Sequence, residues 1–267
     1  MNPQQKKPFI GSLVEGSLDT RVYQDILRAH AKEAISFPGF GNLSITNVDP
    51  KTISRAQLTE CEISPFRQQE FVCSTGDPPP FIRKPSTPKF SAQNVAWQDL
   101  QALLIHSFSP DKAGHRPYPS AGGLYPVEPL VFIFNERLCN QPPLKSGCYH
   151  YRTVSQSLQL IKALPMAFFF EKILHGFIDL NHAPAFCIAY VAHAGKTIFK
   201  YRYRGYRHAL MEAGSMYQHA GHIAQNMDLR NTVWSTFSDH ELLYELGLDH
   251  GTYLALTMQL FGYGESS

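Results

Sequence analysis

Residues 119–134 read Pro-Ser-Ala-Gly-Gly-Leu-Tyr-Pro-Val-Glu-Pro-Leu-Val-Phe-Ile-Phe, a tight turn that leads directly into an apolar run. Gly122 and Gly123 let the backbone turn sharply and approach a ligand closely. Successive N–H groups in such a turn can bind an anion or a cofactor. The run from Glu128 to Phe134 predicts a buried strand. Because any tight loop before a strand can use two glycines, the turn alone leaves a structural role and a cofactor role open.

Helices and apolar strands alternate over the last two thirds of the chain. The predicted helices span 19–36, 97–108, 166–174, 206–227 and 239–246, and the predicted strands span 128–134, 148–151, 185–191, 231–237 and 254–261. This alternation predicts an α+β or α/β three-layer core. Residues 42–75 show short strand-like runs with no clear period, and a soft boundary is predicted near residue 90.

The composition is that of a folded protein with a substantial core. The chain has 267 residues, of which 43% are hydrophobic, and a net charge of +2. That charge is too small to favour general nucleic-acid binding. The five cysteines are odd in number and widely spaced, which argues against a disulfide framework and a zinc cage. They are Cys61, Cys73, Cys139, Cys148 and Cys187.

Neither end of the chain nor its apolar runs indicate a membrane protein. Residues 1–12 carry two lysines without a following apolar run, so no signal peptide is predicted. The longest apolar runs, at 130–134 and 185–192, are too short to span a bilayer. A soluble, cytoplasmic protein is therefore expected.

A second distinctive segment, residues 200–218, reads Lys-Tyr-Arg-Tyr-Arg-Gly-Tyr-Arg-His-Ala-Leu-Met-Glu-Ala-Gly-Ser-Met-Tyr-Gln. With the turn at 119–128, it resembles the thiazole/oxazole dehydrogenases, an FMN-dependent branch of the nitroreductase superfamily. In particular, it is similar to the dehydrogenase subunit of the synthetases that make microcin B-type azole peptides. The resemblance runs from about Ala92 to the C-terminus. It implies a nitroreductase-like α+β core over 91–267, with a mostly antiparallel sheet between helices, and an N-terminal region, 1–90, that contacts partners or peptide.

The resemblance also implies a reaction, the oxidation of thiazoline and oxazoline rings in a ribosomally made precursor peptide to thiazoles and oxazoles. One ring carbon loses an acidic proton and its neighbour loses a hydride, so the reaction needs a base and a hydride acceptor. No side chain accepts a hydride, so a cofactor must accept it. The resemblance implies that this cofactor is FMN. In the dehydrogenases that this segment resembles, the pair matching Lys200 and Tyr201 is catalytic.

The surroundings of this pair bear on its chemistry. Arg202, Arg204 and Arg207 would lower the pKa of Lys200 if they are also close in space. In a flat strand Lys200 and Tyr201 would point to opposite faces. Both can line one site only if the chain bends there, and Gly205 favours a bend. Taken alone, the segment is also typical of a solvated basic strand or of an Arg/Tyr patch that contacts nucleic acid.

The cofactor-binding residues follow from the resemblance and from the phosphate of FMN, which needs cations or backbone donors. The Arg-rich motif of the wider fold has a degenerate counterpart in Arg83 and Lys84, and Arg116 and Arg204 are alternatives. The turn contributes Pro119, Ser120, Ala121, Gly122 and Gly123.

No metal site is predicted. His219 and His222 lie three residues apart on the predicted long helix, but a third ligand of matching spacing is missing.

The predicted partners are a cyclodehydratase, a peptide-recognition subunit and a second copy of the chain, joined through the long helix. Three other functions stay open. The chain could be an NAD(P)H-dependent flavin reductase for small molecules, a non-catalytic assembly subunit that kept the fold, or a nucleic-acid-binding protein that uses residues 200–207.

Overall fold

The computed structural model describes residues 18–34, 48–60, 69, 71, 73, 76, 81–87, 89–174 and 182–265. Cys61 and the predicted helix end at 37–41 lie outside these ranges. An antiparallel sheet forms the centre of the domain, in the order β5-β4-β2-β6-β8-β7. The strands are β2 (Val127–Ile133), β4 (Gly147–Arg152), β5 (Ser157–Ala163), β6 (Phe186–His193), β7 (Leu229–Trp234) and β8 (Tyr253–Tyr263).

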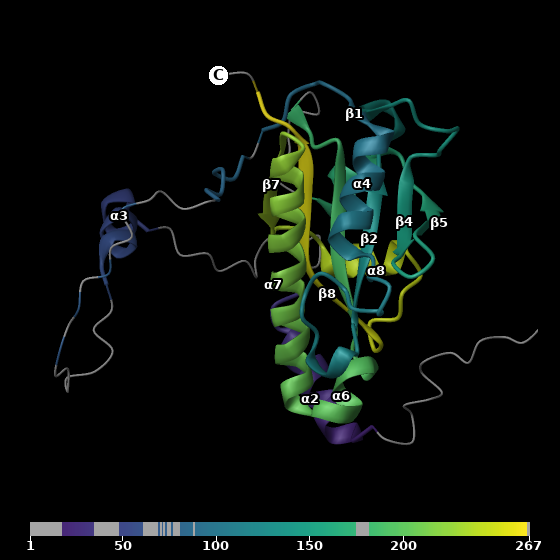
Figure 1. Ribbon diagram of the computed structural model, residues 1–267. Helices are drawn as coiled ribbons and strands as arrows, with labels where there is room; N and C mark the ends of the chain where they lie inside the picture. The colour runs from purple at the N-terminus through teal and green to yellow at the C-terminus, as the bar shows by residue number, and fades with distance from the viewer. Residues whose placement is uncertain are drawn as a thin grey trace, which may run out of the picture.

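Helices cover both faces of this sheet (Figure 1). The principal helices are α2 (Thr20–Ala31), α3 (Pro50–Leu58), α4 (Trp97–Phe108), α6 (Gly195–Tyr201), α7 (Tyr203–Asn226) and α8 (Asp239–Glu245). Shorter elements are β1 (Val95–Ala96), η3 (Ala121–Gly123), η4 (Asn135–Arg137), β3 (Leu138–Cys139), α5 (Met166–Phe168) and η5 (Phe169–Ile173). Among the helices of the described ranges, none is both long and apolar enough to cross a bilayer.

The alternating side chains of β2 explain why the core has three layers. Successive side chains of a strand point to opposite faces. Val131 and Ile133 accordingly join one hydrophobic cluster, together with α4 and α7. Phe132 and Phe134 join a second cluster, together with η5 and α8. A strand with apolar residues on both faces must be covered twice, so the predicted three-layer core is confirmed.

Most predicted elements of the last two thirds are present, with ends shifted by a few residues. Local capping explains two of the helix starts: Asp19 accepts hydrogen bonds from Arg21 N and Val22 N at the start of α2, and Ser238 caps α8. Among the longer elements, the helices α3 and α6 and the strand β5 were not predicted.

Lys200 and Tyr201 do not lie in a strand, so the flat-strand arrangement considered in the sequence analysis does not occur. Both residues lie in the last turn of the helix α6. The chain does bend there, but at Arg202, which has φ 51° and ψ −132° and separates α6 from α7. Gly205 has another role: a Cβ on it would lie 2.8 Å from Thr197 O, so glycine allows α7 to pack closely on α6.

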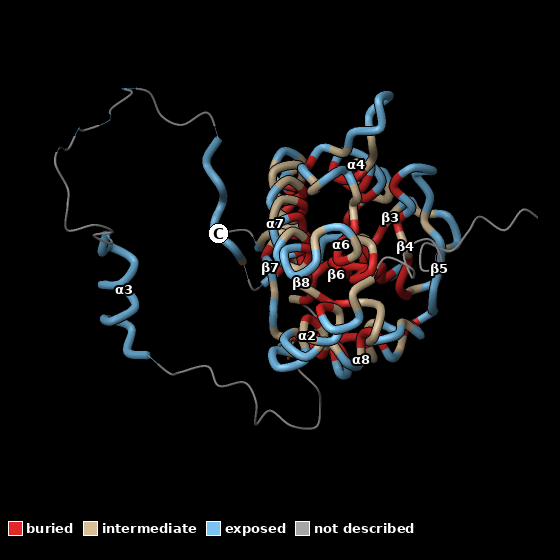
Figure 2. Tube along the Cα trace, turned by 90° about the horizontal axis from the view of Figure 1, so that it is seen from below, coloured by how far each residue is buried: buried red, intermediate tan, exposed pale blue. Residues whose placement is uncertain are grey.

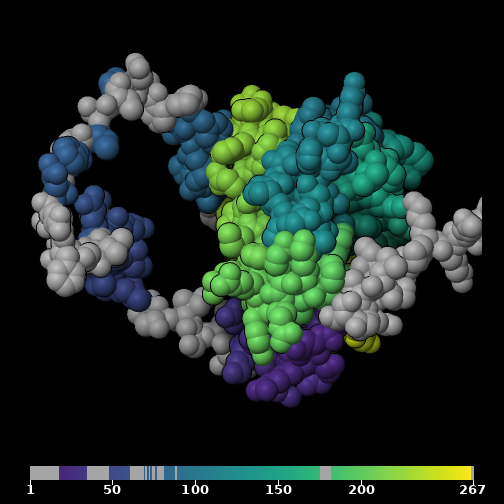
Figure 3. Space-filling view, turned by 60° about the horizontal axis from the view of Figure 1, so that its bottom comes forward, coloured from purple at the N-terminus to yellow at the C-terminus, as the bar shows by residue number. Residues whose placement is uncertain are grey.

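The two N-terminal helices differ in burial. Val22 and Ile26 of α2 belong to the hydrophobic cluster beneath α7, and Figure 3 shows α2 packed against the α6–α7 segment. By contrast, every residue from 48 to 60, which includes α3, is exposed (Figure 2).

Candidate active site

The turn at residues 119–123, hereafter the Gly turn, faces the end of α6. A Cβ built on Gly122 would lie 2.5 Å from Tyr201 Oη and 2.8 Å from Lys200 Nζ. The two polar atoms therefore lie directly against the backbone of Gly122, which has φ 64°. The structure thus brings together two segments that are about 80 residues apart in the chain and that sequence analysis singled out separately.

Lys200 and Tyr201 share this site because α6 ends and the chain turns immediately after them. Lys200 Nζ lies 5.2 Å from the centroid of the Tyr201 ring, within cation–π range. The Tyr201 ring also packs against His208 of α7, whose ring centroid is 4.7 Å away in an edge-to-face arrangement. The pair is thus held between the Gly turn and α7.

A hollow of about 330 Å³ lies beside the pair, between the Gly turn and α7. It is lined by Pro119, Ser120, Ala121, His208, Met211, Glu212 and Ser215. Its wall therefore joins predicted cofactor-binding residues to one face of α7.

Glu212 of α7 links neighbouring parts of the chain beside this hollow. Its side chain is 3% exposed. Its carboxylate accepts hydrogen bonds from Val127 N, at 3.2 Å, and from the Ser120 hydroxyl. Ser120 Oγ in turn accepts a bond from Tyr125 N at 2.8 Å. The hydroxyl of Ser120 therefore holds the shape of the loop, and Glu212 ties the start of the Gly turn to the start of β2.

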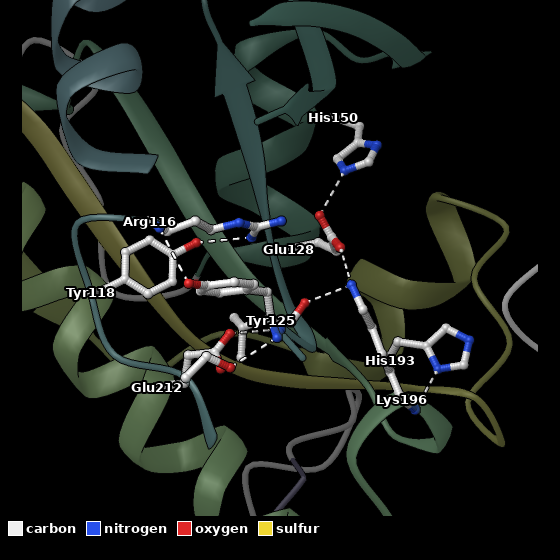
Figure 4. Close-up of polar contacts among 10 residues, drawn as sticks. Arg116, Tyr118, Tyr125, Glu128, His150, His193, Lys196 and Glu212 are labelled. Atoms are coloured by element: carbon white, nitrogen blue, oxygen red, sulfur yellow. Dashed lines mark hydrogen bonds and ion pairs between the residues drawn. The ribbon is translucent and has the colours of Figure 1, made fainter. Parts of the chain in front are cut away.

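A second set of polar contacts holds the outer side of the same loop (Figure 4). Arg116 stacks over the Tyr125 ring, 4.4 Å from its centroid, and donates to Tyr118 Oη at 3.0 Å. Lys196 Nζ, from α6, donates to Tyr125 O at 2.7 Å and lies 3.4 Å from Glu128 Oε1. Arg116 is therefore engaged in holding the loop.

Sequence analysis missed Glu212, Lys196 and Glu128. A signal for Glu212 was available: Ala209, Ala213 and Met216 mark the buried face of the long helix, and Glu212 lies on that face. A carboxyl group on an apolar face requires buried partners. Lys196 carried no comparable signal, because its role depends on a helix that was not predicted.

Arg83 lines a second hollow of about 170 Å³ further along α7, where its Nη1 donates to Ser86 Oγ at 3.3 Å. The other residues around this hollow are Tyr217, Gln218, Gly221, His222, Asn231 and Val233. Residues 211, 215, 218 and 222 recur at spacings of four and three, so the two hollows lie along one face of α7. Arg204, the second residue of α7, is exposed.

The two histidines considered as metal ligands, His219 and His222, contact neighbouring segments of the chain. The His222 ring packs against Phe81 in a tilted arrangement with centroids 4.1 Å apart, and His219 Nε2 lies 3.2 Å from His106 O. Both contacts join α7 to neighbouring segments.

The titration of Glu212 gives a prediction about stability. Burial raises its folded-state pKa from 4.5 to about 7. Below pH 4.5 the carboxyl is protonated in both the folded and the unfolded state, and its contribution to the free energy of unfolding is complete. As the pH rises through 7 that contribution is lost, on the order of 3 kcal/mol. Glu212→Gln does not lose stability in this way, because its amide does not titrate. We expect urea unfolding to show the variant gaining stability relative to the parent between about pH 5 and pH 8; a constant difference would contradict this.

The sheet and its two helical layers have the architecture of the nitroreductase fold. A solved putative nitroreductase from Ralstonia eutropha JMP134 shares it, with a TM-score of 0.57 and 20% identity over 69% of this chain and 80% of that one. The microcin B17-processing protein McbC of Escherichia coli is 36% identical over 183 residues, which are 67% of each protein. This chain belongs to that microcin B17 dehydrogenase-like family of the nitroreductase superfamily.

A solved structure extends the likeness over nearly the whole chain. The E. coli microcin synthetase McbBCD complex with truncated pro-MccB17 bound contains a chain that matches with a TM-score of 0.85 and 29% identity, covering 98% of this chain and 100% of that one. No protein-family model matches the sequence. The nitroreductase-like α+β fold expected from the sequence is confirmed.

Proposed function

We propose that this protein is an FMN-dependent azoline dehydrogenase that oxidises thiazoline and oxazoline rings of a ribosomally made precursor peptide. The observation that carries the proposal is the placement of Lys200 Nζ and Tyr201 Oη against Gly122. A cofactor turn and a base meet there beside a hollow. Family membership supports the same chemistry.

Lys200 acts as the base. Its unprotonated amine takes the proton from the ring carbon between the nitrogen and the peptide carbonyl. Tyr201 holds the ring by a hydrogen bond from its hydroxyl. FMN, when bound, supplies the acceptor for the hydride that leaves the neighbouring ring carbon. The loss of one proton and one hydride converts the azoline to the aromatic azole.

The residues around the two hollows fit a flavin. The Gly turn has no side chain at Gly123, where a built Cβ would meet no described atom within 4 Å, so a flat ring system can approach the backbone there. Arg83, with Ser86 beside it, offers a cation and a hydroxyl for a phosphate in the second hollow. The alignment of both hollows on one face of α7 allows one molecule to reach both.

We further propose that the chain works as a homodimer through α7, within a complex with a cyclodehydratase and a peptide-recognition subunit. The relative in the McbBCD structure is found with partner chains and a bound peptide precursor. Within residues 1–90, α3 is the described element with no buried residue, and it suits a partner-contacting role. Deleting residues 48–60 is expected to keep the flavin and to abolish co-purification with the partners; unchanged co-purification would remove α3 from this role.

The visible spectrum of the purified protein tests the core of the proposal. We expect flavin absorption, and release of FMN rather than FAD on denaturation. Oxidation of an azoline peptide should then proceed with oxygen and without NAD(P)H. A colourless protein that cannot be reconstituted with FMN would support a non-catalytic assembly subunit. Consumption of NAD(P)H with a nitroaromatic acceptor, but no azoline oxidation, would support a small-molecule reductase.

A further inference from the structure

We infer that the N-terminal helix α2 positions the catalytic pair, by fixing the corner between α6 and α7 through Asp19 and Asp25. This inference rests on the proposed function, since it concerns the same Lys200 and Tyr201. Its support comes from a different part of the chain, residues 19–31.

Three contacts join α2 to the corner, all within five residues of Tyr201. Arg202 Nη2 donates to Asp19 Oδ2 at 2.6 Å. Tyr203 Oη donates to Asp25 Oδ2 at 2.6 Å. One turn further along α7, Tyr206 Oη lies 3.2 Å from His30 Nδ1. Together they follow the length of α2.

The helix itself is well anchored, so it can act as a fixed support. Val22 and Ile26 are buried in the main hydrophobic cluster. The hydroxyl of Tyr23 donates to Gly251 O, at the loop before β8. Asp19 also caps the helix through Arg21 N and Val22 N, so the carboxylate that holds Arg202 is itself held in place.

The corner needs such support because of its backbone. Arg202 has φ 51° and ψ −132°, a conformation that glycine adopts readily and other residues adopt only under external constraint. Directly before it stand Lys200 and Tyr201, whose polar atoms must stay against Gly122. If the corner relaxed, both side chains would move away from the Gly turn together.

Because Arg202 is 62% exposed and Asp19 is 34% exposed, their ion pair contributes little to global stability. A loss of positioning should therefore appear in turnover while folding is preserved. Misplacement of a catalytic group by about 1 Å can cost on the order of 100-fold in rate. For the loss of one tie among three, we expect a decrease of about 5- to 20-fold in kcat.

The test is a double-mutant cycle on the full-length protein with FMN and its partners. Asp19→Ser keeps a capping hydroxyl for α2 but cannot reach Arg202. Arg202→Ala removes the same tie from the other side. We expect each variant to lose kcat with an unchanged KM for the azoline peptide, and the double variant to be no worse than the more impaired single one. Lys32→Ala is the matched control, because it removes an exposed charge at the C-terminal end of α2 and leaves Asp19 and Asp25 in place.

The pH profile separates positioning from charge. The informative variant for this comparison is Asp19→Ser, because it breaks the tie and leaves the positive charge of Arg202 in place. Positioning predicts a lower kcat in Asp19→Ser with the pH profile unmoved. Wild-type kcat in Asp19→Ser, additive losses in the cycle, or a shifted profile in Asp19→Ser would each overturn the inference. If Lys200→Ala also retained activity, the proposed function would fail as well; if Lys200→Ala were inactive, only the role of α2 would fail.

Discussion

Replacement of Lys200 by alanine should lower azoline oxidation by a factor of about 10²–10⁴, the usual range for loss of a general base. FMN should stay bound, because Lys200 is exposed and forms no part of the loop contacts made by Glu212, Lys196 and Arg116. The rate of this step is measured directly in a single turnover with an azoline peptide, by monitoring the bleaching of the flavin spectrum.

Lys200→Arg distinguishes a base from a charge. The guanidinium keeps the positive charge but stays protonated at neutral pH. We therefore expect it to be as inactive as Lys200→Ala. Lys162→Ala, which removes a surface lysine paired with Glu245 on the edge of the sheet, is the control for a lost lysine. Substantial turnover by Lys200→Arg would mean that the proton is taken by another group.

Gly122→Ala should be nearly inactive, whereas Gly123→Ala should retain most of the activity. The two glycines have almost the same backbone conformation, φ 64° and φ 65°, so alanine at either position carries a similar strain of about 1–2 kcal/mol. Only the Cβ on Gly122 meets other atoms, at 2.5 Å from Tyr201 Oη and 2.8 Å from Lys200 Nζ. A Cβ on Gly123 would have no atom of the other described residues within 4 Å, its two chain neighbours aside.

We expect a loss of kcat of at least about 100-fold for Gly122→Ala, because the added methyl group displaces both side chains of the proposed catalytic pair. The two variants should unfold at similar urea concentrations, since their backbone strain is the same. Steady-state oxidation and urea unfolding, measured on both proteins, give the comparison. Equal activity in the two variants would show that the catalytic atoms do not depend on the space at Gly122.

Much of the scaffold could be predicted from the sequence because its pattern is strong. The continuous apolar runs that became β2 and β6 permit few alternatives to buried strands. The amphipathic spacing of α4 and the length of α7 were also enough to predict these two helices. The strand β5 was missed because its side chains are mostly exposed, and β-propensity is weak without a buried face.

The site could be predicted only in part. Its two chemical segments were recognisable, but the geometry that joins them was not. The segment 195–201 contains Thr197, Ile198 and Phe199, which favour a strand by propensity. It becomes helical because Thr197 and Ile198 are buried where α7 packs closely at Gly205. Such a tertiary contact leaves no periodic signal in seven residues.

The tie between α2 and the α6–α7 corner has a consequence for synthesis of the protein on the ribosome. Asp25 and Tyr203 are 178 residues apart in the chain, and Tyr23 and Gly251 are 228 apart. Contacts that close such long loops form late, because the entropy of loop closure must be overcome before they stabilise the chain. The helix α2 leaves the ribosome long before its partner Gly251 is synthesised. A nascent chain that stops before Gly251 therefore contains Lys200 and Tyr201 but lacks one of the contacts that anchor α2.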